Sequence, residues 1–302
     1  LKELLTDRDV IRPRLPSFIH RLLFSEIARK RVKKVSKDYA TIGGKSPIFE
    51  DTEAVAASMG ALAFHRYLPE THGHFLEIAR QLDADEICVF PLFPQFSYAT
   101  TGSIARWFST HLPDALQKKL SWIPSYATHP FFVQAMKANI AEFLSEKGLK
   151  EEEVVLLFSA HGLPQAFIDT GDPYQTHCED SFREISAGFP RALSRLSYQS
   201  KFGRGQWITP YTSEVCRNIQ EWRAGKATIV FIPLSFTSDH VETLFEIEQL
   251  YLPVIERRGL KAYRCPALNL RKDWLEAIVE IVQTSERVGN EALIFDLALP
   301  RT

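Results

Sequence analysis

Cysteine is scarce in this chain of 302 residues, which contains only Cys88, Cys178, Cys216 and Cys265. No two of them lie within three residues of each other, so the sequence has no CxxC-type metal or redox motif. Four dispersed thiols in a chain of this length favour a reducing compartment over a disulfide-bonded scaffold. We therefore expect a cytoplasmic protein whose cysteines are mostly buried as small apolar side chains.

Long hydrophobic runs and an excess of charge are also lacking. No apolar run reaches the roughly 18 to 20 residues that a membrane-spanning helix needs. The formal net charge is −1, which gives no indication of nucleic-acid binding. No signal peptide is visible, and the chain starts at Leu1 without Met, so we expect that an N-terminal segment is missing.

The sequence instead contains an alternation of short apolar runs and helical patterns. The apolar runs expected as strands cover residues 61–67, 86–93, 120–126, 153–158, 195–199, 227–233 and 261–266. The helical patterns cover residues 71–82, 103–111, 131–147, 173–186, 213–224, 242–257 and 273–287. Strands that alternate with helices predict parallel sheets covered by helices, and nearly continuous apolar runs are typical of buried parallel strands.

The distribution of these strands predicts two similar α/β domains, residues 1–127 and 128–302, joined near residues 126–130. The first domain has one strand fewer, which agrees with a lost N-terminal strand. The last helix is expected to belong to the second domain, and packing back onto the first is left open. Ligands of open parallel sheets bind beyond the carboxyl ends of the strands, so the loops there deserve most scrutiny.

His161 follows the apolar run VVLLFSA and is expected at the carboxyl end of a central strand. Histidine transfers protons near neutral pH and binds transition metals, although a structural histidine bonded to the backbone remains an alternative. A serine hydrolase is disfavoured, because no G-x-S-x-G elbow surrounds Ser159. A zinc hydrolase is disfavoured as well, since no HExxH motif is present.

Asp239, Glu242 and Glu246 are spaced i, i+3, i+7 after the apolar run 227–233, which places them on one face of a helix. Asp239 and Glu242 also suit a helix cap. Glu246 is less well explained by capping. The spacing alone therefore leaves a cap with a solvated face and a functional site equally favoured, and His240, one residue off this face, is interpreted as structural.

Four segments at compatible spacing resemble the ferrochelatase family. They are FSAHGLP followed by GDPY (158–164 and 171–174), PLFPQFSYATTGS (91–103), YQSKFGRGQW (198–207) and FTSDHVETLFE (236–246). The resemblance runs in order from about Leu1 to Asn269 and so covers nearly the whole chain. Members of this family insert Fe²⁺ into a porphyrin to complete protohaem.

The resemblance implies an α/β fold with two Rossmann-like, chelatase-type domains, each a parallel four-stranded sheet with helices on both faces. It also implies His161 as proton acceptor and metal contact, with Glu242 facing it across the pocket. Asp239 and Glu246 match an acidic path next to Glu242, along which either protons leave or metal ions enter. The porphyrin contacts that we expect on the same basis are Arg66, Phe96, Tyr98, Thr101, Pro164 and Trp207.

Departures from the family pattern limit what the resemblance implies. The first strand with its Gly-Thr-Pro-like loop is absent, and Ala40 and Thr41 stand where some members carry arginines, so Arg66 or another base must bind the porphyrin propionates. Gly162 replaces a serine of many members, which we interpret as a mild change. Tyr98 replaces a cluster cysteine and no cysteine follows Cys265, so no [2Fe–2S] cluster is expected.

The favoured hypothesis is therefore a ferrochelatase that acts on protoporphyrin IX, with ferrous iron and porphyrin as its partners. A coproporphyrin III ferrochelatase is the nearest alternative. A non-catalytic porphyrin- or haem-binding homologue, a cobalt or nickel chelatase and a periplasmic metal-binding protein are the others. The apolar substrate would allow peripheral contact with a membrane, although the sequence has no recognisable anchor.

Overall fold

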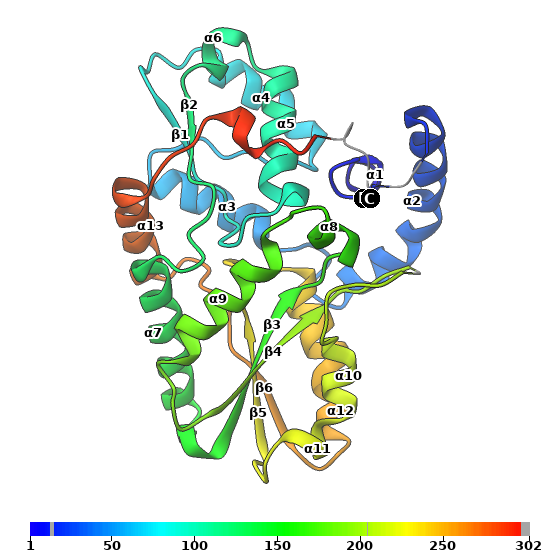
Figure 1. The fold of residues 1–302 in the computed structure, drawn as a ribbon, viewed down its shortest axis with the longest axis vertical. Helices are drawn as coiled ribbons and strands as arrows, with labels where there is room; N and C mark the ends of the chain where they lie inside the picture. The colour runs from blue at the N-terminus through cyan, green and yellow to red at the C-terminus, as the bar shows by residue number, and fades with distance from the viewer. Residues whose placement is uncertain (13–14, 204, 297–302) are drawn as a thin grey trace.

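Two parallel sheets of unequal size organise the chain, as the computed structural model of residues 1–12, 15–203 and 205–296 reveals (Figure 1). The sheet of the first half pairs β1 (Ile87–Val89) with β2 (Leu120–Trp122). The sheet of the second half has the order β4 (Leu193–Gln199), β3 (Val154–His161), β5 (Thr228–Pro233) and β6 (Lys261–Arg264). The predicted α/β class with parallel sheets is confirmed.

The first sheet is smaller than the sequence predicts. Among the described residues of the first half, 61–67 form no strand. Phe64 of this stretch packs instead on Trp107 and Phe108, with ring centroids 4.7 and 4.9 Å apart. The apolar side chain of Phe64 is thus buried by packing on α5 rather than by strand pairing, and the expectation of a four-stranded sheet in each domain was wrong for the first.

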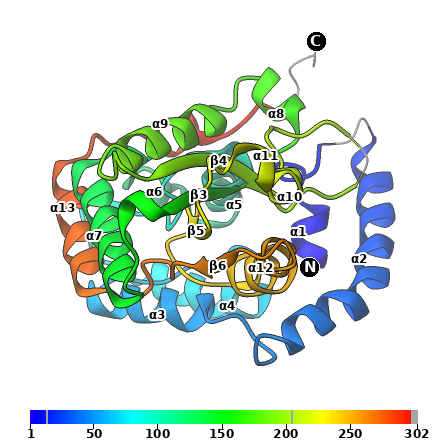
Figure 2. The same cartoon turned by 90° about the horizontal axis from the view of Figure 1, so that it is seen from below.

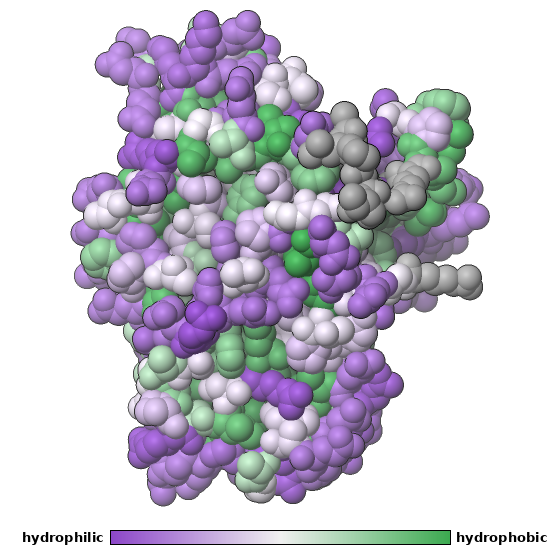
Figure 3. All heavy atoms as spheres, in the orientation of Figure 1, coloured by the Kyte–Doolittle hydropathy of each residue, from purple (hydrophilic) through white to green (hydrophobic). Residues whose placement is uncertain are grey.

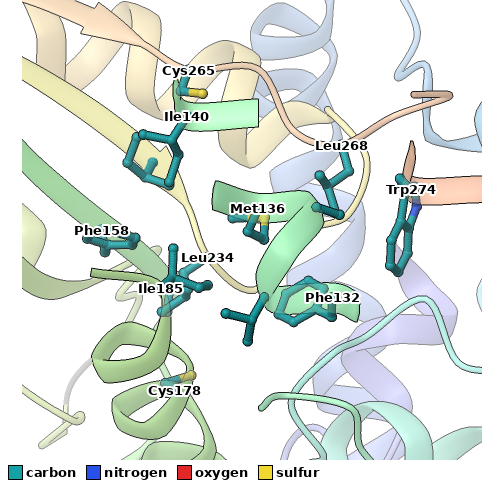
Figure 4. Close-up of a cluster of buried hydrophobic side chains, with 14 of the residues drawn as sticks. Phe132, Met136, Ile140, Phe158, Cys178, Ile185, Leu234, Cys265, Leu268 and Trp274 are labelled. Carbon is teal, nitrogen blue, oxygen red and sulfur yellow. The ribbon is translucent and has the colours of Figure 1, made fainter. Parts of the chain in front are cut away.

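The second sheet lies between helices, and its central strands are almost wholly buried, whereas the edge strands β4 and β6 are partly exposed. Its two central strands, β3 and β5, pair in the register Phe158↔Ile232. Leu156 and Phe158 point into one apolar cluster with α7 (Pro130–Glu146), shown in Figure 4, whereas Val155 and Leu157 belong to a second cluster on the opposite face. This alternation of side chains along the strands explains why the sequence runs are apolar throughout.

Helices cover both faces of the second sheet (Figures 1 and 2). One face carries α7 and α9 (Tyr174–Ser186), and the other carries α10 (Thr212–Arg217), α11 (Ile219–Trp222) and α12 (Leu252–Glu256). The remaining helices are α1 (Lys2–Thr6), α2 (Ser17–Ala40), α3 (Ile48–Ser58), α4 (Pro69–Ala79), α5 (Ser103–His111), α6 (Asp114–Gln117), α8 (Gln165–Asp169) and α13 (Lys272–Thr284). Short 3₁₀ turns cover Glu151–Glu153 and Asn290–Leu293.

The last long helix bridges the two predicted domains. Helix α13 packs along α7, and its buried Trp274 also contacts Phe90 and Tyr126 of the first half, at ring-centroid distances of 6.3 and 6.0 Å. One apolar cluster therefore continues across residues 127 and 128. The division at this point stays a prediction.

Candidate active site

The strand order brings the ends of β3 and β5 together. Because β4 lies on one side of β3 and β5 on the other, the chain reverses direction across the sheet at β3, where ligand crevices form in such folds. His161 is the last residue of β3, and its backbone N–H donates to Ser235 Oγ at 2.9 Å just after β5. The sequence prediction that His161 stands at a strand end is confirmed.

The side chain of His161 is held as a neutral imidazole. Its Nδ1 lies 2.6 Å from the Gly162 carbonyl oxygen, which accepts only, so Nδ1 carries the proton and Nε2 keeps a lone pair. Burial lowers the pKa of His161, and the nearby charge of Glu242 offsets only part of that effect. A neutral imidazole with a free Nε2 is able to accept a proton or bind a metal ion.

Glu242 is an anion whose charge is balanced by His240. The His240 Nε2 lies 2.9 Å from Glu242 Oε2. Burial alone would raise the pKa of Glu242, but the charge and hydrogen bond of His240, together with His161, hold that pKa at about 2. Burial would lower the pKa of His240, and Glu242 raises it instead. Glu242 is therefore a negative carboxylate with His240 as its partner, and His161 is the neutral imidazole of the site.

Glu242 begins a π-helix, η3 (Glu242–Tyr251), where the sequence indicates an ordinary helix. Gln199, at the end of β4, donates from its Nε2 to the Glu242 carbonyl at 2.7 Å and to Glu246 Oε2 at 3.0 Å. Burial raises the pKa of Glu246 to about 7, against a 2.7 Å hydrogen bond from Ser200. Glu246 is thus a carboxyl group that gains and loses a proton near neutrality.

Asp239 is separated from the other two carboxylates by its hydrogen bonds. Its Oδ1 accepts from Arg264 Nη1 at 2.7 Å and from Thr243 Oγ1 at 2.8 Å, and its Oδ2 accepts from Asn269 Nδ2 at 3.0 Å. Asp239 is buried, and these partners fix the chain before η3. The structure gives Asp239 an anchoring environment, whereas Gln199 donates to the carboxylate of Glu246 and to the backbone carbonyl of Glu242.

Pro164 and Trp207 lie side by side at the rim of the His161 loop. They form an isolated antiparallel bridge, extended by the hydrogen bond from Ile208 N to the Leu163 carbonyl. A Cβ on Gly162 would lie 2.8 Å from the Gln199 carbonyl and 3.3 Å from the Trp207 ring. The absence of a side chain at Gly162 therefore lets Trp207 approach the loop.

The predicted porphyrin loop of the first half is tied to the second half. Asp172 Oδ2 accepts from Ser97 Oγ at 2.8 Å and from the Tyr98 N–H at 3.0 Å. Tyr98 begins a second π-helix, η1 (Tyr98–Gly102), and its ring stays half-buried. Phe96 is almost wholly buried and Thr101 fully so, so Tyr98 is the member of this predicted set that is open to a ligand.

Arg66 has another partner for its charge. Its Nη2 lies 2.7 Å from Asp7 Oδ2, and its Nε donates to Ser103 Oγ at 3.0 Å. Ser103 Oγ in turn lies 2.5 Å from Asp7 Oδ2. The guanidinium that the sequence assigned to a propionate is thus used to attach α1 to the start of α5.

Helix α2 contributes residues that the sequence did not single out. The charge of Glu242, acting after the larger effect of burial, raises the pKa of Tyr39, which places the end of α2 close to this carboxylate. Arg31 lies over the Phe202 ring at 5.2 Å, and Phe202 packs on Trp207. The basic helix α2 therefore contacts the rim through Arg31 and Phe202.

His240, Gln199 and Ser235 are the other residues that sequence reasoning missed. Gln199 and Ser235 directly end or follow strands of the second sheet, so strand-end position was a usable signal for them. His240 gave no such signal, because its role depends on the backbone turn before η3. Within the described residues, no group of three His, Cys, Asp or Glu side chains could hold a metal ion by itself.

Fold and site together define an α/β chelatase-type protein with its candidate site at strand ends. Two solved structures resemble the fold: CbiX, described as the terminal enzyme of sirohaem biosynthesis in denitrifying bacteria (18% identity, TM-score 0.51, covering 80% of this chain and 94% of that one), and SirB from Bacillus subtilis with Fe³⁺ (16%, TM-score 0.54, 84% and 92%).

Sequence relatives are far more similar. The family model for ferrochelatase matches residues 1–286. A ferrochelatase of Chlamydia abortus is 43% identical over 300 residues, covering 97% of this chain and 92% of its own, and one of Chlamydia muridarum is 40% identical over 307 residues, covering 100% and 93%. The chain belongs to the ferrochelatase family, whose members are lyases of haem biosynthesis.

Proposed function

We propose that this chain inserts Fe²⁺ into protoporphyrin IX, with His161 and Glu242 at the reacting centre. The observation that carries the proposal is a neutral imidazole, fixed through Nδ1, that feels the charge of a carboxylate with a pKa of about 2. The reaction replaces two porphyrin N–H protons with one Fe²⁺ ion, so it needs a proton acceptor and a negative group that attracts the metal.

The two side chains divide these tasks. His161 contacts the incoming ion through its Nε2 lone pair and, after the ion has passed to the porphyrin, accepts one pyrrole proton at the same atom, while the second pyrrole proton passes to water. Glu242 supplies negative charge and an oxygen ligand, and its ion pair with His240 keeps it aimed at the centre. Two protein ligands leave the other coordination positions of Fe²⁺ to water and then to the porphyrin nitrogens, as required of an ion that is delivered rather than retained.

The porphyrin is gripped by the rim and by the loop of the first half. Tyr98 and Pro164 supply partly exposed apolar surface, and the buried Trp207 supports Pro164 through the bridge between them. Since Arg66 is paired with Asp7, Arg31 beside Phe202 is the better candidate to bind a propionate. Phe96 and Thr101 are buried, which favours a role in supporting Tyr98 rather than in contacting the porphyrin.

Glu246 is proposed to carry protons rather than metal. Beyond it lies a cavity of about 350 Å³ lined by Gln199, Ser200, Lys201, Tyr211, Ser213, Cys216, Arg217, Leu250, Tyr251 and Val254. Two cationic side chains in this lining, Lys201 and Arg217, repel Fe²⁺, and the next carboxylate along η3, Glu248, is paired with Arg264 at 2.7 Å. A carboxyl group with a pKa of about 7 and a link to Gln199 is suited to proton exchange.

Anaerobic incubation of the protein with Fe²⁺ and either protoporphyrin IX or coproporphyrin III tests the function. We expect haem absorption to appear faster with protoporphyrin IX. Faster insertion into coproporphyrin III would assign the alternative substrate. Tight porphyrin binding without any metal insertion would support a non-catalytic porphyrin-binding protein and overturn the proposal.

We also propose peripheral contact with an anionic membrane through α2. No helix in the described part of the chain is long and apolar enough to cross a bilayer. Phe18 and Leu22 are 68% and 71% exposed, on the helix whose later turns carry Arg29, Lys30 and Lys34, and Figure 3 shows this apolar patch at the upper right. Exposed apolar side chains beside basic ones favour anionic lipid surfaces.

Sedimentation with vesicles tests this contact. We expect the protein to bind phosphatidylserine-containing vesicles and the double variant Phe18→Ser, Leu22→Ser to bind them several-fold less. Equal sedimentation of both proteins would exclude this surface. A cytoplasmic location for such a peripheral protein stays a prediction.

A further inference from the structure

After α13 the chain returns to the first half of the molecule as residues 288–295, the C-terminal strap, which crosses α5 in Figure 1. Val288 exchanges two backbone hydrogen bonds with Trp122 of β2, at 2.9 and 3.0 Å. Asn290 is buried and donates from Nδ2 to the Ala105 carbonyl of α5 at 3.0 Å. The strap is therefore an integral part of the first half, although it follows the second in sequence.

The strap packs tightly under the loop that carries Tyr98. The Leu293 carbonyl approaches Gly102 so closely that a Cβ there would lie only 2.7 Å from it. Phe295 is buried, and its ring centroid lies 5.2 Å from that of Tyr98, which contacts Phe96 on another side at 5.1 Å. The orientation of the half-buried Tyr98 ring is thus set by two aromatic neighbours, one of them from the strap.

Arg12 connects the strap to the loop that follows His161. Its guanidinium carbon lies 4.0 Å from the Phe295 ring centroid and 3.9 Å from that of Phe167. Phe167 belongs to α8, which begins at Gln165, four residues after His161. A planar cation between two aromatic faces is a favourable stack, and here it joins one segment from each side of the candidate site.

We propose that Phe295 and Arg12 are positioning residues, which set the spacing between the Tyr98 loop and the His161 loop and so the width of the porphyrin site. The inference rests on the proposed function for its ligand but on contacts outside the reacting centre for its geometry. Neither residue touches the metal. Their loss should weaken porphyrin binding while the chemistry at His161 and Glu242 continues.

Binding and turnover of Phe295→Ala provide the test, with Glu291→Ala as the matched control because Glu291 is exposed on the same strap. In the absence of metal, the fluorescence of protoporphyrin IX titrated with protein gives the Kd. We expect Phe295→Ala to raise the Kd and the porphyrin KM by roughly tenfold, since small misplacements of site walls are costly, with kcat within about threefold. A Kd and KM within twofold of the unmodified protein would overturn the proposal.

A second variant covers the case in which Phe295→Ala does not fold. Arg12→Lys keeps the charge but loses the planar face that stacks on both rings, and it creates no large cavity. The same rise in porphyrin Kd and KM is expected, by about three- to tenfold. An Arg12→Lys protein that binds porphyrin normally would contradict the proposed link even if Phe295→Ala cannot be studied.

Hydrogen exchange separates failure of this inference from failure of the proposed function. If the unmodified protein binds no porphyrin, the function fails, yet the strap still predicts faster amide exchange at residues 96–102 in Phe295→Ala than in Glu291→Ala. Unchanged exchange in that segment would show that the strap does not hold the loop. Faster exchange without a change in porphyrin KM would show that the loop does not set the site.

Discussion

The two halves of the candidate site are built by different means. In the second half, the residues lie at the ends of strands of a four-stranded sheet. His161 ends β3, Gln199 ends the neighbouring β4, and Glu242 follows β5 on the other side of β3. The first half has two strands of three residues, and its Tyr98 loop is held by Asp172, by α5 and by the C-terminal strap. On the proposed function, the sheet gives the reacting groups a fixed geometry, whereas the loop and helices of the first half contribute surface for the porphyrin.

Among the variants that test this comparison, Glu242→Gln is expected to have the largest effect on the rate of metal insertion. The amide keeps the shape but removes the charge that attracts Fe²⁺ and pairs with His240. Insertion should fall by about a hundredfold or more, because loss of a charged metal contact costs several kcal/mol, with porphyrin Kd little changed. Anaerobic initial rates measure this, with the exposed Glu256→Gln as control, and a tenfold weaker porphyrin affinity with normal turnover would reverse the assignment of the halves.

Glu246→Gln should have a smaller effect that distinguishes proton from metal transport. Proton transfer through this group accounts for up to about a hundredfold in rate, so kcat should drop within that limit while the KM for Fe²⁺ stays the same. A raised KM for Fe²⁺ with normal kcat would instead identify the route as a metal path.

Tyr98→Ala should affect the other half of the site. Removing an aromatic contact of about 1 kcal/mol or somewhat more predicts a porphyrin KM raised by roughly tenfold and an unchanged kcat. Steady-state rates at varied porphyrin measure both. The comparison between the halves would break down if this variant lost kcat to the extent expected for Glu242→Gln.

Gly162→Ser tests how tightly the rim of the site is packed. The added side chain would meet the Gln199 carbonyl at 2.8 Å, so we expect a loss of about 1–3 kcal/mol in the free energy of unfolding, as for other overpacked sites. Gly73→Ser is the control, because nothing lies within 4 Å of a Cβ at that exposed position. Denaturant unfolding of the two variants measures the difference, and equal stabilities would mean that the rim is loosely packed.

Sequence reasoning succeeded where local pattern and tertiary packing agree. All four strands of the second sheet fall within a few residues of their predicted positions, and the two central strands do so because buried parallel strands leave a nearly continuous apolar signal. Helix α5 has the predicted bounds. The predicted strand at 61–67 was wrong because Phe64 packs on Trp107 of α5, and a strand also needs a partner that local pattern does not reveal.

The site was predictable in part for similar reasons. His161 and Glu242 could be placed from strand ends and from the family resemblance, but π-helical geometry has no separate sequence period. Pro253 gives one physical reason for the change from η3 to α12, since its missing N–H and its ring disfavour a continuous α-helix across that point. The partners of Arg66 and Asp239 depend on residues 25 to 59 positions away, which no local pattern specifies.

The central claim is that residues of the second half carry out metal insertion, whereas the first half and the rim bind the porphyrin. His161→Ala tests it most directly, with turnover and metal-free porphyrin Kd measured on the same anaerobic preparation. We predict that kcat falls by about a hundred- to ten-thousandfold while the Kd stays within about threefold of the unmodified protein. Near-normal turnover in His161→Ala would contradict the account.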